Sequence, residues 1–221
     1  MKGLMMKWIP LAFLMVLAPL PAQASPWTPA DGARLEFDVL RDGGKFGTHI
    51  LRFDREGDTL TVDTDVELRV TLGPITLFEH LHDVTEKYSA DRLVWIGSRT
   101  KTGGKWKTLS VEAVDGGFNV KGEKFKGLLT SPIIPSTHWN EDQMRQGFLF
   151  STETGERLPM KVTDRGIEKI NAGGRSIDAR RYDVDSELDA SFWYDAQGLW
   201  VKTAFDAEGS KIEYVLRKLP S

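Results

Sequence analysis

The chain has 221 residues, with 29 basic and 32 acidic side chains, a formal net charge of −3 at pH 7, and no cysteine. The absence of cysteine excludes disulfides and thiolate chemistry, and a chain of this length can bury a core without such cross-links. The slightly acidic balance and the lack of a basic run argue against a nucleic-acid-binding surface. No pattern in the sequence calls for a cofactor, so none is expected.

Residues 1–24 have the pattern of a signal peptide. A short positive start is followed by the apolar run Ile9–Leu20 and by the small-x-small signal Ala22-Gln23-Ala24. The apolar run is short and contains two prolines, which disfavours the alternative of an uncleaved membrane anchor. We therefore expect cleavage after Ala24, a periplasmic or secreted protein without a transmembrane segment after cleavage, and a single β domain over residues 25–221.

The first half of the mature chain alternates apolar and polar residues with a period of two, which is typical of half-buried strands. The clearest strand is Thr59–Val70, in which Leu60, Val62, Val66 and Leu68 share one face. Helical spacing would mix the two sets of residues. Turn signals such as Asp42-Gly43-Gly44 and Glu56-Gly57-Asp58 separate the successive strands. The remaining strands predicted here are 33–40, 48–54, 76–89, 92–100, 106–114 and 118–125.

The stretch Ser131–Asn140 interrupts this rhythm with two prolines and a His-Trp pair. After it, residues 140–146 are predicted to form one short helix. Asn140 can cap that helix, with Gln143 three residues later as its capping-box partner.

Strands resume after the helix, over residues 157–163, 166–171, 175–185, 188–194, 199–205 and 211–216. Turn signals roughly every ten residues are the signature of an all-β domain, and successive hairpins favour an antiparallel meander. So many strands must curl or close, because their apolar faces and edges need cover. The predicted fold is a single antiparallel meander forming a strongly curved sheet or a partly closed barrel, divided into two strand groups by the central stretch.

Three pieces of sequence carry a resemblance to a known family. They are Thr137-His138-Trp139-Asn140, then Thr152-Glu153-Thr154-Gly155-Glu156, and the C-terminal run from Phe192-Trp193-Tyr194-Asp195 to Gly209-Ser210-Lys211. Together they resemble a bacterial family of exported proteins defined as domain of unknown function 6134, over most of the mature chain. The resemblance implies export and an all-β fold, and it assigns no catalytic residues. The layout is also loosely similar to that of curved-sheet periplasmic carriers of lipophilic cargo, which is an analogy at the level of fold.

Two histidines in the predicted strand 76–89 raise the question of a metal. His80 and His82 are two residues apart and therefore share a face, with Glu86 in phase further along. A zinc site needs a third ligand, for which His138 is the candidate. The alternative is that both histidines are polar residues on an outer face, flanked by Glu79 and Asp83.

The central stretch supplies the other candidate site residues. His138 can act as a general acid or base or as a hydrogen-bond donor to a ligand, with Ser136, Trp139 and Asn140 beside it. The structural alternative is that Asn140 caps the helix while His138 and Trp139 close one end of the sheet. Trp95, Trp193 and Trp200 lie in strands with apolar residues on both faces, so they either line a cavity for an apolar ligand or pack the core.

Three functions follow from these patterns. The first is a non-catalytic binding or accessory protein that holds an apolar or amphiphilic small molecule, or a segment of an envelope protein, against the curved sheet. The second is a metal- or His-dependent enzyme that uses His138 with His80 and His82. The third is a structural envelope protein, which an exposed apolar patch would indicate.

Overall fold

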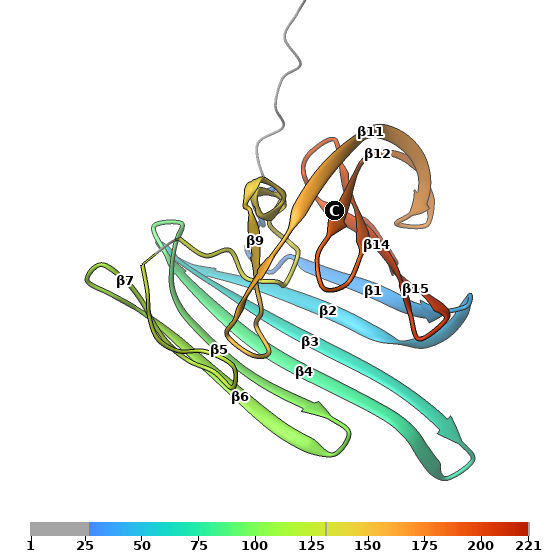
Figure 1. The fold of residues 1–221 in the computed structure, drawn as a ribbon. Coiled ribbons are helices and arrows are strands. Elements are labelled where there is room, and N and C mark those ends of the chain that lie inside the picture. The colour runs from blue at the N-terminus through green and yellow to red at the C-terminus, as the bar shows by residue number, and fades with distance from the viewer. Residues whose placement is uncertain (1–26, 131, 221) are drawn as a thin grey trace, which may run out of the picture.

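Thirteen strands form one antiparallel sheet in the computed structural model, which describes residues 27–130 and 132–220 (Figure 1). The predicted signal peptide, residues 1–24, lies outside the described residues. The N-terminal strands are β1 (Arg34–Arg41), β2 (Gly44–Glu56), β3 (Thr59–Leu72), β4 (Ile75–Ser89), β5 (Arg92–Thr102), β6 (Lys105–Val114), β7 (Gly117–Lys121) and β8 (Lys126–Leu129). The C-terminal strands are β11 (Lys161–Ala172), β12 (Arg175–Asp185), β13 (Ala190–Asp195), β14 (Trp200–Ala207) and β15 (Ser210–Leu216).

The period-two pattern predicts the buried faces correctly. Leu60, Val62, Val66 and Leu68 of β3 are all buried, and Leu35, Phe37 and Val39 of β1 pack in the same interior. Since neighbouring side chains of a strand point to opposite faces, each hairpin continues the same apolar surface onto the next strand. The all-β, strongly curved fold is therefore confirmed.

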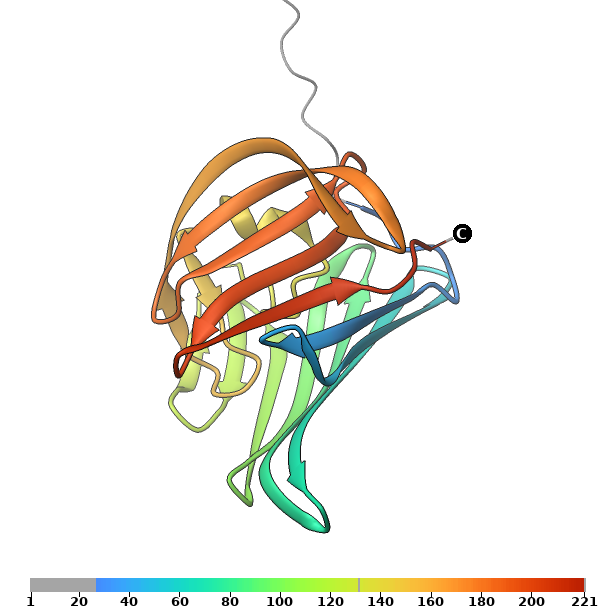
Figure 2. The same ribbon diagram turned by 90° about the vertical axis from the view of Figure 1, so that its right-hand side faces the viewer.

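The sheet is assembled from two meanders that meet through the first and last strands. Its order runs from β11 through β15, then from β1 through β8. β1 pairs with β15 in a register that places Phe37 opposite Leu216 and Arg41 opposite Ile212. The first and last strands therefore lie side by side in the interior of the sheet, and its edges are β8 and β11. These edge strands do not pair with each other, so the sheet curls without closing (Figure 2).

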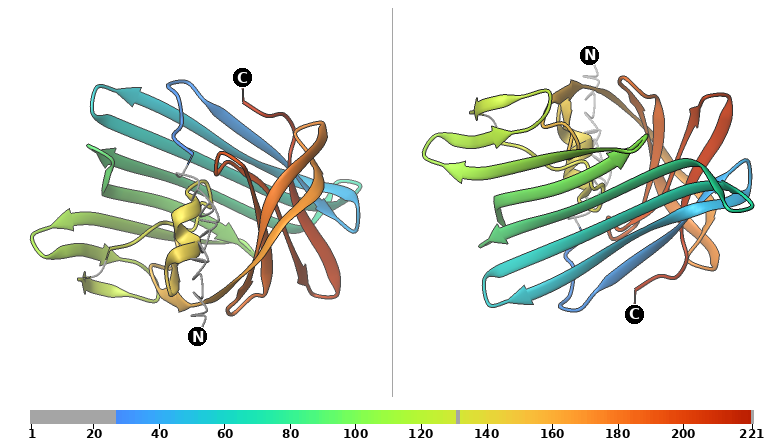
Figure 3. Two further views of the ribbon diagram at one scale, coloured as in Figure 1. Left: turned by 90° about the horizontal axis from the view of Figure 1, so that it is seen from above. Right: turned by 90° about the horizontal axis from the view of Figure 1, so that it is seen from below.

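The chain between the two edges lies inside the curl. We call Pro132–Phe150 the plug segment; it contains a 3-10 helix, η1 (Glu141–Arg145), and strand β9 (Phe148–Phe150), which pairs with β10 (Arg157–Pro159). Figure 3 shows it between the two strand groups. Ile133 and Phe150 pack against β4–β8, while Trp139 and Met144 join the larger core cluster that includes strands of both groups. Apolar burial on both sides holds the segment in place.

The short helix predicted over residues 140–146 exists, but it spans only Glu141–Arg145 and is a 3-10 helix. Asn140 caps it as expected, because its side-chain oxygen accepts a hydrogen bond from the backbone N–H of Asp142 at 2.9 Å. The predicted capping box is wrong, because the side chain of Gln143 donates to the Tyr194 hydroxyl at 2.6 Å. Within the part of the chain that the structure describes, no helix has the length and apolar character needed to cross a membrane.

Candidate functional site

All four histidines of the chain line a single cavity inside the curl. His49 comes from β2, His80 and His82 from β4, and His138 from the plug segment. The cavity has a volume of about 350 Å³. Residues from β2, β3, β4, the plug segment and β12–β15 surround it, so it lies where the two meanders and the plug segment meet.

The walls of this cavity differ in chemistry. The C-terminal strands contribute a mainly apolar wall that includes Phe192, Trp200, Phe205 and Tyr214. The rest of the lining is mixed: it includes the polar side chains of His80, His82, Ser136, Thr152 and Glu153 and the apolar side chains of Val66, Leu149 and Leu158. A concave, mainly apolar site with a few placed polar groups is the usual form of a small-molecule site.

His82 is held rigidly and is uncharged at neutral pH. Its Nδ1 lies 2.8 Å from the Thr100 hydroxyl and its Nε2 lies 3.0 Å from the Thr152 hydroxyl. Burial, with a smaller contribution from nearby His80, lowers the pKa of His82 to about 3. Thr152 in turn bonds Ser136, with 3.1 Å between the two hydroxyl oxygens. The His82 side chain is therefore part of a hydrogen-bonded wall of the cavity. The alternative that placed it on an outer face of the sheet is wrong for His82.

His138 has a strained backbone conformation, and contacts of its carbonyl group and of its side chain hold it in place. Its backbone has a φ of 67°, which is unusual for a residue other than glycine. Its carbonyl accepts from the Tyr194 hydroxyl at 2.9 Å, and its Nδ1 lies 3.0 Å from Oε1 of Gln143. The imidazole packs on Phe192, with ring centroids 4.8 Å apart. Burial lowers the pKa of His138 to about 4, against the opposing effect of the Gln143 hydrogen bond, so this ring is also neutral at pH 7.

A buried carboxylate attaches the plug segment to the sheet. Glu86 on β4 is fully buried and accepts hydrogen bonds from the hydroxyls of Tyr88 and Thr137 and from the indole N–H of Trp139, the last at 3.2 Å. Burial raises the pKa of Glu86, and the three donors partly offset that rise. Sequence reasoning placed Glu86 in phase with His80 and His82 but missed this role. The sequence did contain a signal for this role, because Glu86 is an acidic residue in phase with Val84 and Tyr88 on an apolar face of the strand.

His49 is the second residue whose role the sequence did not reveal. It is only 4% exposed, and among the described residues neither of its ring nitrogens has a hydrogen-bond partner. Its ring lies edge-on to Trp200 and Tyr214, with centroids 5.2 and 5.7 Å away. Burial lowers its pKa well below the ordinary value, so the imidazole is neutral. In the sequence it was visible only as one residue in phase with Leu51 and Phe53.

The predicted metal site on His80, His82 and His138 is not formed. Among residues 27–130 and 132–220, no three His, Cys, Asp or Glu side chains are placed so that they could hold one metal ion. The rings of His80 and His82 are 6.3 Å apart, and both nitrogens of His82 already bond threonine hydroxyls. His138 uses Nδ1 to contact Gln143 on the plug segment.

The other candidate residues divide between the cavity and the outside of the sheet. Ser136 and Trp200 line the cavity with His138, while Trp139 packs beside it on Phe53 and Tyr88. Asn140 serves as the helix cap.

Trp95 and Trp193, two of the candidate ligand-binding residues, do not line the cavity. Trp95 folds back over Gly97, with the Lys87 ammonium 5.6 Å from its ring. Trp193 points to the face opposite Phe192 and Tyr194 and donates to Glu168 at 2.6 Å. Sequence alternation did not separate them because their strands are apolar on both faces.

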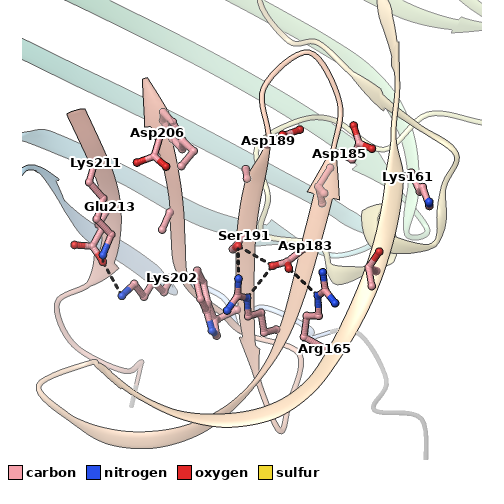
Figure 4. A pocket seen from close by; sticks show the side chains of 17 residues that line it. Lys161, Arg165, Asp183, Asp185, Asp189, Ser191, Lys202, Asp206, Lys211 and Glu213 are labelled. Atoms are coloured by element: carbon pink, nitrogen blue, oxygen red, sulfur yellow. Dashed lines mark hydrogen bonds and ion pairs between the residues drawn. The ribbon is translucent and has the colours of Figure 1, made fainter. Parts of the chain in front are cut away.

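A larger hollow of about 690 Å³ lies on that opposite face of β11–β15 (Figure 4). Asp183 bonds Arg165, Arg181 and Ser191 there, and Glu213 pairs with Lys202 and Lys211. Its lining has five basic and five acidic side chains: Lys161, Arg165, Arg181, Lys202, Lys211, Asp183, Asp185, Asp189, Asp206 and Glu213. Because these charges balance and many pair with one another, the hollow selects no ligand by charge, and the histidine-lined cavity is the better candidate.

Comparison with known proteins agrees with the resemblance noted in the sequence. The family model for domain of unknown function DUF6134 matches residues 37–217. The chain belongs to this family. No curated protein matches the sequence.

The DUF6134 fold also has a counterpart among solved structures. The crystal structure of a beta-barrel-like protein of domain of unknown function DUF1849 from Brucella abortus superposes with a TM-score of 0.57 at 14% sequence identity. The match covers 84% of this chain and 95% of that one. At this identity the similarity shows the shared barrel-like fold and carries no statement about function.

Proposed function

We propose that this DUF6134 protein is a non-catalytic binding protein that holds one small apolar or amphiphilic molecule in the histidine-lined cavity. We further propose that it works in the periplasm, or is secreted, after removal of residues 1–24 and as one β domain over residues 25–221. The observation that carries the binding proposal is the histidine-lined cavity itself, with aromatic side chains from β13–β15 and polar side chains from β4, the plug segment and Thr152.

The size and chemistry of the cavity favour a compact ligand. A volume of about 350 Å³ is near the lower end of the usual range of small-molecule pockets, roughly 300 to 1,000 Å³. The rings of Phe192, Trp200 and Phe205 supply apolar contact, while Ser136 and Thr152 supply hydroxyls. A molecule with an apolar body and one polar end uses both walls.

The plug segment acts as the closure of the site. It contributes Ser136 and His138 to the lining, and its hydrogen bonds to Glu86 set its position relative to β4. The cavity is also lined by the exposed side chains of Glu187 and Leu188, where it is open to solvent. The His-dependent enzyme alternative has less support, because His82 and His138 bond neutral threonine and glutamine side chains and so lack the acidic partner that orients a catalytic histidine. His80 has Glu153 3.8 Å from its Nε2, which is beyond hydrogen-bond distance.

Native mass spectrometry of full-length protein, expressed with its leader and purified without detergent, tests the binding proposal. We expect an adduct that organic extraction removes. Val66→Phe should abolish the adduct, because Val66 lines the cavity and a larger ring fills it. Glu67→Phe is the matched control, since it places the same ring on the exposed face of β3. The proposal fails if neither an adduct nor an extractable molecule is found.

A second candidate, an envelope interaction protein, is favoured by one specific observation. Ile75, Leu77 and Phe78 at the start of β4 are 59%, 63% and 40% exposed. They lie on the β3–β4 hairpin, which extends beyond the rest of the sheet (Figure 1). Exposed apolar side chains at one tip are typical of a contact surface. Replacing Ile75 and Leu77 with serine should then reduce co-purification with envelope fractions without changing the adduct.

A further inference from the structure

His49 differs from the other three histidines of the cavity in its hydrogen bonding. His82 bonds two threonine hydroxyls, His138 bonds Gln143, and Nδ1 of His80 lies 2.8 Å from the Thr102 hydroxyl. His49 has no such contact at either nitrogen within the described part of the chain, although it is more than nine-tenths buried. Native proteins rarely leave a buried polar group unpaired, because this costs stability, so a retained one points to a role outside the apo fold.

The surroundings of His49 favour a rigid apolar partner. Its ring is bordered by Phe37, Trp200 and Tyr214, with centroid separations of 5.9, 5.2 and 5.7 Å. Trp200 and Tyr214 also line the cavity, so a molecule that reaches His49 contacts their rings. Flat aromatic or alicyclic bodies fit such walls better than flexible chains, because they lose less conformational freedom on binding.

The charges around the cavity select the polar group of the ligand. Its lining includes the carboxylates Glu153 and Glu187 and, among the described residues, no lysine or arginine. An anionic head group would therefore be repelled and desolvated without compensation. A neutral imidazole has one donor and one acceptor nitrogen, and a hydroxyl group can bond either of them, whichever tautomer is present.

From these observations we infer that His49 is the recognition residue for a compact apolar molecule with an uncharged hydroxyl group, such as a phenol or an alicyclic alcohol. Both ring nitrogens of His49 are covered in the structure, so the imidazole turns toward the cavity when the hydroxyl bonds it, while the apolar body packs on Trp200 and Tyr214. This inference rests on the proposed function, because it names the ligand class of the same cavity.

Equilibrium dialysis with two matched probes tests the inference. Naphthol and naphthalene have the same ring system and differ only in the hydroxyl. The full-length protein should bind naphthol about tenfold or more tightly than naphthalene, after correction for their different hydrophobicity, which is the worth of one buried hydrogen bond. His49→Phe should lose this preference while still binding naphthalene, and His49→Gln, which keeps a donor and an acceptor, should restore part of it.

His80→Phe is the control from the same cavity and should keep the preference, since the His80 ring already bonds Thr102. The thermal unfolding midpoint of His49→Phe should equal or exceed that of the parent, because the substitution removes an unpaired buried group. If both probes bind equally well, or His80→Phe loses the preference as His49→Phe does, the role of His49 is overturned and cavity binding stands. If neither probe binds, cavity binding itself is overturned.

Discussion

Glu86 and His49 are both polar side chains buried inside the curled sheet, on β4 and β2, and their surroundings are opposite. Glu86 accepts three hydrogen bonds, two of them from Thr137 and Trp139 of the plug segment. His49 has aromatic neighbours and, among the described residues, no hydrogen-bond partner at either nitrogen. A paired buried group stabilises the fold, whereas an unpaired one weakens it, so we assign Glu86 to structure and His49 to recognition.

The largest expected effect is a loss of stability in mild acid. His49, His82 and His138 all have pKa values lowered by burial, so they stay neutral in the folded protein while the unfolded chain protonates below pH 6.5. These histidines therefore do not reduce the free energy of unfolding above pH 6.5. As the pH drops from 6.5 toward 4, the free energy of unfolding falls by up to about 1.4 kcal/mol per pH unit for each histidine. The raised pKa of Glu86 changes the free energy of unfolding in the opposite direction, and it offsets at most the contribution of one histidine.

Urea unfolding at pH 7, 6 and 5 measures this dependence. The carboxylates with lowered pKa values, such as Asp38 and Glu79, lose their stabilising contribution mainly below this window, because their unfolded pKa values are 3.8 and 4.5. A free energy of unfolding that is constant from pH 7 to 5 would contradict the assignment of neutral, buried imidazoles.

Glu86→Ala is expected to destabilise the protein by about 3 kcal/mol or more, because it leaves three buried donors without an acceptor and also creates a cavity. Glu86→Gln keeps the shape and one acceptor oxygen, so its cost should be roughly half as large. Glu79→Ala is the control: it removes surface ion pairs with Lys101 and Arg69, which solvent screens, so its cost should be much smaller. Urea unfolding at neutral pH gives all three values, and equal costs for Glu86→Ala and Glu79→Ala would remove Glu86 from its structural role.

His82→Phe and His49→Phe make the same substitution at a hydrogen-bonded and at an unpaired buried histidine, and so test the comparison directly. His82→Phe should cost about 1 to 3 kcal/mol, because it leaves Thr100 and Thr152 without their partner. His49→Phe removes no hydrogen bond and should be neutral or stabilising. Thermal and urea unfolding of the two variants measure their stabilities. If His49→Phe proved less stable than His82→Phe, His49 would have a structural partner.

The smallest expected effect is that of Trp95→Phe on binding. Trp95 lies over Gly97 outside the cavity, so the variant should lose only part of a surface cation–π contact with Lys87, about 0.5 to 1 kcal/mol. Its affinity for naphthol should equal that of the parent. A marked loss of affinity in dialysis would instead place Trp95 in contact with the ligand.

Much of the fold could be predicted because its signals are local. Alternation assigned Leu60 and Val62 to a buried face, and the turn residues separated the strands. Asn140 was recognised as a cap because capping depends on residues only two positions apart. The site was predicted only in part: Ser136 and His138 line the cavity, but the metal site on His80, His82 and His138 was wrong, since sharing a face of the interior did not bring the three rings together around one point.

The sequence alone determined which side chains share a face of each strand, because the backbone of an extended chain turns successive side chains to opposite sides. Tertiary structure alone decided that β1 pairs with β15, that Thr137 and Trp139 reach Glu86 from more than 50 residues away, and that His49 lies among aromatic rings without a partner. The reason is physical: a strand can pair with many others, and whether a buried polar atom is satisfied depends on neighbours brought by distant parts of the chain.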